Sequence, residues 1–171
     1  MTQMATPWEI KKAMIKKYNY EEFITMYKDL GTVLLIGGCG TGKSVFIHKY
    51  IKEIINEDVD IYVIDPKQVD FFDLKDNRKV IYIDNTEDIQ EKLLSNIDNK
   101  RCVKKTYVFI DEYAEIKWSK EVNKGIRNLI FNRHELNIEL VVASQIKDTF
   151  CTRLKTSVDA VITLNSHPRN K

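Results

Sequence analysis

The 171-residue sequence contains no long hydrophobic run and little cysteine, proline or glycine. No stretch approaches the roughly 18 consecutive apolar residues of a membrane-spanning helix, so we expect no direct membrane span. The first residues, MTQMATPWEIKKAM, lack the basic-then-apolar pattern of a secretory leader. We therefore expect a protein that acts in the cytoplasm.

The three cysteines, Cys39, Cys102 and Cys151, are odd in number and show no CxxC spacing. This pattern argues against a disulfide framework and against a zinc site, and it is typical of a reducing compartment. The sequence also has no Pro/Gly-rich linker and no internal repeat. We expect one compact domain at residues 31–171, preceded by a helical extension at residues 1–30.

Neither sign of charge dominates the whole chain, whose formal net charge is +2. The distribution is uneven, because residues 51–99 carry 13 acidic and 6 basic side chains, whereas residues 100–171 carry 14 basic and 8 acidic ones. Such asymmetry occurs where one face meets a polyanion and another meets an oppositely charged neighbour. Solvated faces that merely differ in charge would give the same counts. Only motifs can therefore distinguish an interaction surface from an ordinary solvated face.

Short apolar runs alternate with amphipathic segments along the chain. The apolar runs predict strands at 32–37, 60–65, 79–84, 106–112, 138–144 and 159–164. Apolar residues at three- and four-residue spacing predict helices within 7–29 and at 43–57, 86–98 and 121–135. Thr86 is the expected N-cap of the helix at 86–98. Alternating strands and helices indicate an α/β fold with a mostly parallel central sheet covered by helices.

A glycine-rich segment links the first core strand to the helix that follows it. Residues 37–44, GGCGTGKS, match the P-loop pattern GxxxxGK[ST]. Glycines let the backbone wrap around a phosphate, and the helix adds the positive end of its dipole. We expect Lys43 to reach the β- and γ-phosphates of ATP and Ser44 to ligate Mg²⁺. The expected nucleotide-binding residues are Gly37, Gly38, Cys39, Gly40, Thr41, Gly42, Lys43, Ser44 and Val45.

Two carboxylates follow the buried strand YVFI, at Asp111 and Glu112. Ligands of open α/β sheets bind at the carboxyl ends of the strands, where these side chains would emerge. We expect Asp111 to bind Mg²⁺ opposite Ser44, and Glu112 to act as the general base that polarises the attacking water. A glutamate after the aspartate favours hydrolysis of the bound nucleotide over its storage.

An uncharged polar residue, Gln145, stands at the end of the next strand, VVASQ. Its amide can both donate and accept hydrogen bonds. At the carboxyl end of a strand that follows the Asp111-Glu112 strand, it would lie beside the γ-phosphate. We expect Gln145 to sense that phosphate and to contact the attacking water.

Together these motifs resemble those of the FtsK/HerA superfamily of ring-forming ATPases. Ile64-Asp65-Pro66-Lys67 with Asp70 resembles the IDPKxxE stretch of FtsK/SpoIIIE-type translocases, and the segments DEYAE and ASQ resemble their DEFAD-like and ATQ motifs. Asn132-Arg133-His134, followed by Asn137-Ile138 and Ser144-Gln145, is similar to a pattern of poxvirus, giant-virus and tectivirus packaging ATPases. The resemblance covers about residues 31–165 and implies a RecA/ASCE-like P-loop NTPase fold.

The resemblance implies an ATP-driven double-stranded DNA translocase that packages the genome of a virus or virus-like mobile element. It further implies a homo-oligomeric ring, a hexamer in such families, that grips DNA of any sequence and docks on a capsid vertex or transfer-channel protein. A viral protein of this kind would reside in the host cytoplasm or the virion. An FtsK-type DNA-transfer ATPase, acting in conjugation or partition, is the alternative. A small nucleotide kinase and a non-motor ATP-binding module are less favoured.

Two arginines are candidates to complete the site of a neighbouring subunit. Arg153, in Arg153-Leu154-Lys155-Thr156, coincides with the arginine of the viral (I)RxN element, although Thr156 departs from that pattern. Arg133 is the second candidate, but it could instead orient the strand end within its own subunit. Arginine suits such a role because it stays charged and offers a rigid fork of donors.

Overall fold

The computed structural model describes residues 24–25, 28, 31–97, 101–145 and 156–164. The candidate Arg153 therefore lies outside the described residues, as does all of the expected helical region 7–29 except residues 24–25 and 28. Within them, the elements in chain order are β1 (Thr32–Gly37), α3 (Lys43–Ile54), β2 (Val59–Ile64), η1 (Phe72–Leu74), β3 (Val80–Ile83), η2 (Gln90–Leu94), α4 (Ser95–Ile97), β4 (Lys105–Ile110), η3 (Tyr113–Glu115), α5 (Lys120–Leu136), β5 (Ile138–Ser144) and β6 (Ala160–Leu164).

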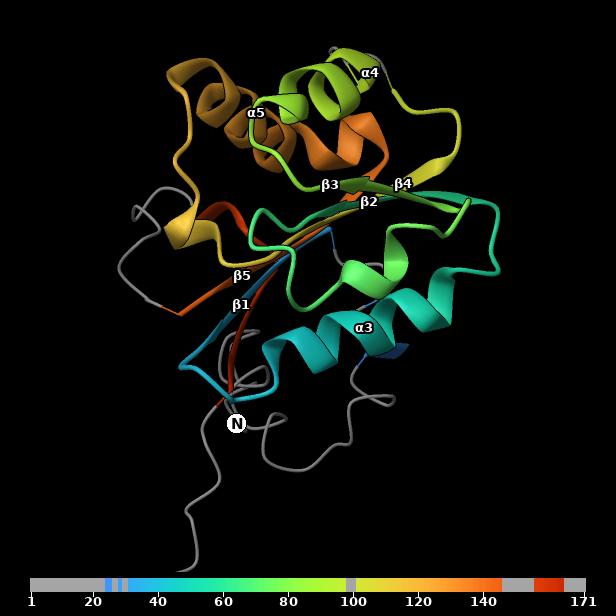
Figure 1. Ribbon diagram of the computed structural model, residues 1–171. Helices are drawn as coiled ribbons and strands as arrows, with labels where there is room; N and C mark the ends of the chain where they lie inside the picture. The colour runs from blue at the N-terminus through green and yellow to red at the C-terminus, as the bar shows by residue number, and fades with distance from the viewer. Residues whose placement is uncertain (1–23, 26–27, 29–30, 98–100, 146–155, 165–171) are drawn as a thin grey trace, which may run out of the picture.

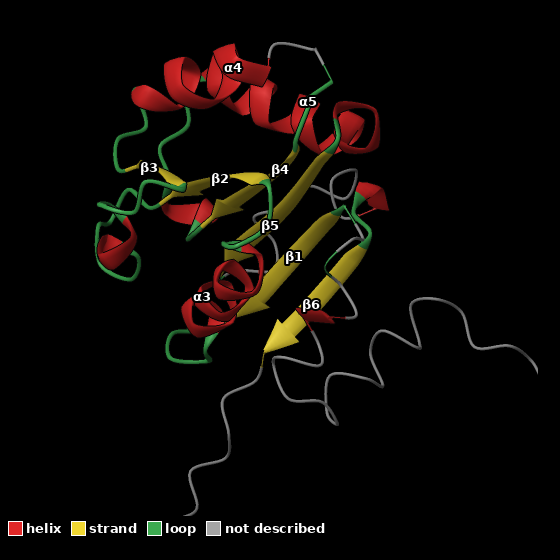
Figure 2. Ribbon diagram, turned by 90° about the vertical axis from the view of Figure 1, so that its right-hand side faces the viewer, coloured by secondary structure: helices red, strands yellow, loops and turns green. Residues whose placement is uncertain are grey.

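The six strands form one sheet in the order β3-β2-β4-β5-β1-β6, which Figure 2 shows from the side of β6. Every pair of neighbouring strands is parallel. The expected α/β fold is thus confirmed. Because all strands point the same way, every carboxyl end lies at one edge of the sheet. Strand β5 separates β1, which leads into the P-loop, from β4, which leads into Asp111 and Glu112.

Helices cover both faces of the sheet, with α3 on one side and α4 and α5 on the other (Figure 1). The strands are mostly apolar, as expected for strands buried on both faces. In β1, Val33 and Leu35 pack on the α3 side with Phe46 and Ile47, whereas Leu34 and Ile36 belong to the core under α5. This double burial fixes the register of β1, since a shift by one residue would exchange its two faces.

Helix α5 has well-defined ends. Its N-cap residue, Ser119, accepts a hydrogen bond from the Val122 backbone N–H at 3.1 Å. At its other end, Asn137 adopts the left-handed conformation with φ 62°, and its N–H bonds back to carbonyls of the last turn. The helix therefore stops directly before β5 and sets where that strand begins.

The prediction that Thr86 caps a regular helix at 86–98 is wrong. Residues 86 and 87 form a turn, because Asn85 accepts the N–H of Glu87 through its side chain (3.0 Å) and the N–H of Asp88 through its carbonyl (3.2 Å). Helical residues begin at Asp88, and the π-helix η2 follows over Gln90–Leu94. An asparagine just before the segment took the capping role that the threonine was expected to fill.

No helix among the described residues has both the length and the apolar character needed to cross a membrane.

Candidate functional site

The P-loop joins β1 to α3 at the carboxyl edge of the sheet. Gly40 and Gly42 have φ values of 73° and 92°, which residues with a Cβ rarely adopt, and Gly42 occupies the N-cap position of α3. The Thr41 hydroxyl donates a hydrogen bond to the Gly38 carbonyl at 2.9 Å. Cys39 is exposed and its thiol is free. The loop therefore has the backbone that the sequence pattern predicts for phosphate binding.

The Lys43 ammonium group lies over this loop although its side chain is only 5% exposed. It donates hydrogen bonds to the carbonyls of Gly37 and Gly38, at 2.9 and 3.0 Å. It also lies 3.6 Å from Oε1 of Glu112, which comes from the end of β4. The fold thus brings the P-loop lysine and the candidate general base into one ion pair.

Glu112 connects this lysine to the end of β5. Its Oε1 accepts a hydrogen bond from Nε2 of Gln145 at 3.1 Å. Its other carboxylate oxygen, Oε2, is buried and has no hydrogen-bond partner. Glu112 also has a left-handed backbone, with φ 48° and ψ 47°, which is strained for a glutamate. The structure therefore gathers Lys43, Glu112 and Gln145 from three neighbouring strand ends.

Asp111 is buried, with a relative exposure of 3%, and its Oδ1 has no hydrogen-bond partner. Burial, followed by the charges of Glu112, Asp70 and Asp65, raises the pKa of Asp111 to about 7. A buried carboxylate with a free oxygen beside other negative charges is a suitable place for a cation. Asp111 and Ser44 therefore fit the Mg²⁺ that the sequence predicts for them.

Within the described residues, no three histidine, cysteine, aspartate or glutamate side chains form a cluster that could hold a metal ion by themselves.

One contact of the site was not expected from the sequence. The Ser44 hydroxyl donates a hydrogen bond to Oδ2 of Asp70 at 2.9 Å. Asp70 was noted only as the acid that follows Asp65-Pro66-Lys67. Its position in that stretch was the available signal, but its contact with the P-loop depends on the path of a loop that periodicity does not predict.

Arg133 lies at the opposite edge of the sheet. Its guanidinium forms two hydrogen bonds to the carboxylate of Asp159, one of them from Nη2 at 2.9 Å, and donates a third to the Ile130 carbonyl at 2.8 Å. Asp159 also accepts the N–H of Thr32, the first residue of β1, at 2.7 Å. Arg133 thus ties the end of α5 to the starts of β1 and β6, at the amino ends of the strands.

The absence of a side chain at Gly31 leaves room for the Arg133–Asp159 ion pair. The φ of Gly31 is +99°, and a Cβ there would lie 2.5 Å from Oδ2 of Asp159 and 2.9 Å from Nε of Arg133. A side chain at position 31 would therefore collide with both members of the pair.

Replacing Arg133 with alanine is expected to lower the free energy of unfolding by about 2 kcal/mol at pH 7, because it leaves a half-buried carboxylate without its charged donors. Burial opposes ionisation of Asp159, but the hydrogen bonds from Arg133 and Thr32 and the charges of Arg133 and His134 hold its pKa below the ordinary value. The pair therefore stabilises the fold above about pH 4, and this contribution disappears as the pH falls through the folded-state pKa.

Urea unfolding of wild type and Arg133→Ala at several pH values checks this expectation. Arg127→Ala, which removes an exposed arginine from the same helix, is the matched control. A stability difference that stayed constant down to pH 2 would contradict the role given to the ion pair.

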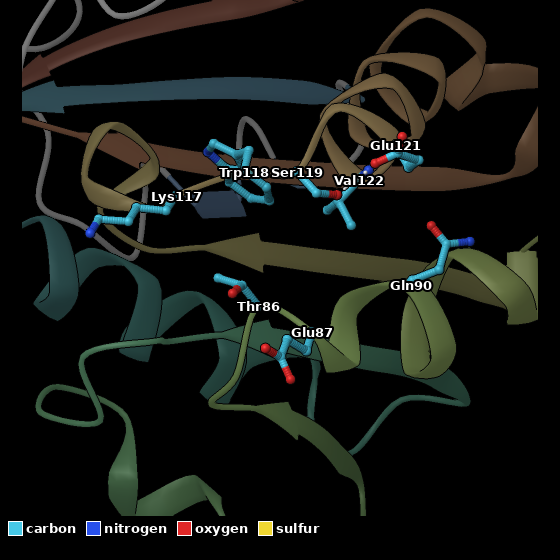
Figure 3. A pocket seen from close by; sticks show the side chains of 8 residues that line it. All are labelled: Thr86, Glu87, Gln90, Lys117, Trp118, Ser119, Glu121 and Val122. Atoms are coloured by element: carbon cyan, nitrogen blue, oxygen red, sulfur yellow. Dashed lines mark hydrogen bonds between the residues drawn. The ribbon is translucent and has the colours of Figure 1, made fainter.

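A pocket of about 460 Å³ lies elsewhere, between the turn that follows β3 and the start of α5. Figure 3 shows Thr86, Glu87 and Gln90 on one side of it and Lys117 and Trp118 among the residues on the other. None of the residues expected to bind phosphate, metal or water lines this pocket. It is therefore separate from the cluster around Lys43.

Residues 31–153, which include the P-loop, both carboxylates and Gln145, match the family model for the AAA domain. The chain belongs to the AAA domain family. A comparison of this AAA domain with curated protein sequences finds no match.

Solved structures similar to this AAA domain include a conjugation coupling protein, a type VII secretion ATPase and a genome packaging NTPase. The conjugation coupling protein TcpA of pCW3, with ATPγS, matches with a TM-score of 0.68 and 18% identity over 80% of this chain and 49% of its own. EccC of Thermomonospora curvata (ATPases 2 and 3, with a signal sequence peptide) matches with 0.66 and 12% over 82% and 31%. The genome packaging NTPase B204 of Sulfolobus turreted icosahedral virus 2, with ATPγS, matches with 0.56 and 19% over 82% and 78%.

At these identities the similarity concerns the fold. Together with the family match, it confirms the expected P-loop NTPase fold. The AAA domain spans less than half the length of the EccC and TcpA chains, 31% and 49% respectively. The activities and partners of those whole proteins are therefore carried over to it only as proposals.

Proposed function

We propose that this chain hydrolyses ATP and couples the hydrolysis to translocation of double-stranded DNA in the packaging of a viral or virus-like genome. The observation that carries the proposal is the Glu112 carboxylate held between Lys43 (3.6 Å) and Gln145 (3.1 Å). The Glu112 carboxylate as a base, the Lys43 ammonium as a phosphate-binding group and the Gln145 amide as a group that can contact water therefore lie close together. This arrangement is the one that P-loop hydrolysis requires.

Each group has a defined task in this proposal. The N–H groups of residues 37–45 and the Lys43 ammonium bind the phosphates, and Glu112 accepts a proton from the attacking water while Gln145 orients that water. Ser44 and Asp111 would hold Mg²⁺, which would supply positive charge to the phosphate oxygens. Gln145 bonds to Glu112 from the end of β5, which lies between β1 and β4, and from there its amide would also contact the γ-phosphate.

A basic stripe on α5 is the proposed DNA contact among the described residues. Lys120, Lys124 and Arg127 are exposed and lie on one face of the helix, because their spacing is four and three residues. A translocase must grip any sequence, so such contacts would go to phosphates rather than to base edges. The net positive charge of residues 100–171 supports this choice.

DNA binding is expected to be independent of sequence and to weaken steeply with salt. Removing two of the phosphate-binding charges, in Lys124→Ala/Arg127→Ala, should reduce the slope of log affinity against log salt by about 1.8, since each contact contributes about 0.9. Fluorescence anisotropy with unrelated duplexes of equal length, at several salt concentrations, measures both properties.

The matched control is Lys52→Ala/Arg78→Ala, which removes two exposed charges from residues outside α5. An equal change of slope in the control would show that the stripe is not the contact surface. A strong preference for one duplex would indicate a regulator rather than a translocase.

DNA-stimulated ATP hydrolysis separates the proposal from the other classes. A translocase accelerates turnover when duplex DNA is added, whereas a nucleotide kinase responds to its second substrate and a non-motor module turns over negligibly in both cases. An FtsK-type transfer ATPase would behave as the packaging motor does in this assay. Asp65-Pro66-Lys67 and the fold of TcpA favour that alternative, whereas the Arg133-His134 and Ser144-Gln145 pattern favours packaging.

We further propose a homo-oligomeric ring, a hexamer by resemblance, that docks on a capsid vertex or transfer-channel protein. A capsid gene next to the gene of this chain would support packaging, and a relaxase gene would support conjugative transfer.

A further inference from the structure

The loop that follows β2 is folded back by a buried carboxylate. Asp65, which is 1% exposed, accepts hydrogen bonds from the backbone N–H groups of Gln68 and Phe71, at 3.2 and 3.3 Å. It also accepts one from the Tyr82 hydroxyl of β3, at 2.8 Å. Gln68 takes a left-handed backbone with φ 56° within this turn. These three hydrogen bonds to the buried Asp65 carboxylate fix the path of the loop.

This path places Asp70 against the start of α3. The His48 ring bonds through Nε2 to the Asp70 carbonyl at 2.6 Å and stacks on Phe71, with ring centroids 4.7 Å apart. The Asp70 side chain is exposed, yet its Oδ2 accepts the Ser44 hydroxyl proton at 2.9 Å. The loop therefore presents one carboxylate to one P-loop hydroxyl.

The direction of this hydrogen bond has a chemical consequence. A serine hydroxyl has one proton and two lone pairs, and it can ligate a cation only through a lone pair. When the proton is donated to Asp70, both lone pairs of Ser44 Oγ remain available. Outer partners of this kind orient metal ligands, and their loss commonly weakens metal binding by about 10- to 100-fold.

A second observation indicates that a cation belongs beside this pair. Asp111 is buried at the end of β4, and its Oδ1 has no hydrogen-bond partner. Asp111 follows β4, and Asp70 lies on the loop that follows the neighbouring strand β2, so both carboxylates lie at the carboxyl ends of the strands. Their mutual repulsion is relieved by a divalent cation.

We infer that Asp70 is a positioning residue of the Mg²⁺ site, where it accepts the Ser44 proton and so directs the serine lone pairs towards the ion. The inference rests on the proposed function, because it requires that the P-loop bind a nucleotide with Mg²⁺. It assigns a task to the acid of the IDPKxxE-like stretch, with Asp65 and Tyr82 holding the loop that carries it.

Manganese binding tests the inference without reference to hydrolysis. Mn²⁺ is titrated into the full chain in the presence of ATPγS, and free Mn²⁺ is measured by electron paramagnetic resonance. Asp70→Ala is expected to bind Mn²⁺ about 10- to 100-fold more weakly than wild type. Asp70→Asn, which keeps an acceptor for the Ser44 proton, should show a smaller loss. Asp76→Asn, an exposed acid on the same connection, is the control and should match wild type.

A thermodynamic cycle with Ser44→Ala shows whether Asp70 acts through the serine. In the Ser44→Ala background, Asp70→Ala should have little further effect on Mn²⁺ affinity, because no hydroxyl remains to be oriented. Affinity for ATPγS in the presence of EDTA should be the same in wild type and Asp70→Ala, which a merely structural role would not predict.

The outcomes separate the inference from the function on which it rests. If wild type binds no Mn²⁺ with the nucleotide, the proposed function fails. If wild type binds Mn²⁺ and Asp70→Ala binds it equally or more tightly, the inference fails, because Asp70 would then be dispensable or would compete with the ion for Ser44. Full additivity in the cycle would also overturn it.

Discussion

Replacing Glu112 with glutamine is expected to slow ATP turnover by about 10²-fold or more, while ATP affinity stays close to that of wild type. The glutamine keeps the size of the side chain and can still meet Gln145, which lies 3.1 Å away. It cannot accept a proton from water at neutral pH. The defect should therefore appear in kcat and not in nucleotide binding.

Steady-state hydrolysis with duplex DNA, together with titration of a fluorescent ATP analogue, measures the two quantities separately. Glu121→Gln, an exposed glutamate in the first turn of α5, is the matched control and should retain turnover. Wild-type turnover in Glu112→Gln would show that another group, or the substrate itself, accepts the proton.

A second large effect is expected at Arg153, which we propose as the arginine that completes the site of a neighbouring subunit. An arginine that neutralises charge on the γ-phosphoryl oxygens is worth about 10³–10⁵ in turnover. Arg153→Ala subunits, which keep their own Lys43 and Glu112, should bind ATP normally and be nearly inactive alone. Lys155→Ala removes a neighbouring basic residue and is the control.

Mixing two inactive variants decides whether Arg153 acts across an interface. Lys43→Ala subunits cannot bind the phosphates, but each can lend its Arg153 to a competent neighbour. Mixtures of Arg153→Ala and Lys43→Ala subunits should therefore recover part of the activity. Full activity of Arg153→Ala alone, or no recovery despite demonstrated co-assembly, would contradict this role.

Arg133, the second candidate, is already engaged at the far edge of the sheet. Its guanidinium is bound to Asp159 and to the Ile130 carbonyl, and its side chain is only 11% exposed. A transferable arginine needs a free fork of donors. We therefore propose an intramolecular role for Arg133, as the sequence had left open, but one that positions α5 against β1 instead of orienting the end of the strand at 138–144.

The strands were predictable because their signal is local. Continuous apolar runs rich in β-branched residues predict strands buried on both faces, and β5 was expected at 138–144 with the bounds that the structure has. Helix α3 was expected to run to residue 57 but ends at Ile54. The P-loop could be placed because its pattern, the preceding strand and the following helix all agree.

The remaining features depend on contacts between distant segments. Strand order is not encoded in periodicity, so the sequence did not predict that β5 would separate β1 from β4 or that β6 would pair with β1. The Arg133–Asp159 pair joins residues 26 positions apart and exists only because β6 begins beside β1. The Ser44–Asp70 contact likewise requires the turn held by Asp65.

The backbone of Glu112 sets stability and activity against each other at one position. In the left-handed conformation a residue with a Cβ is disfavoured by roughly 1–2 kcal/mol, whereas glycine is not and asparagine or aspartate adopts it more readily. Selection for a more stable fold alone would therefore remove the glutamate from position 112. A glutamate is nevertheless present, with its carboxylate between Lys43 and Gln145. Engineering that stabilises this protein by relieving backbone strain should leave position 112 unchanged. Replacing Glu112 with glycine would remove the strain, but it would also remove the carboxylate proposed to activate water.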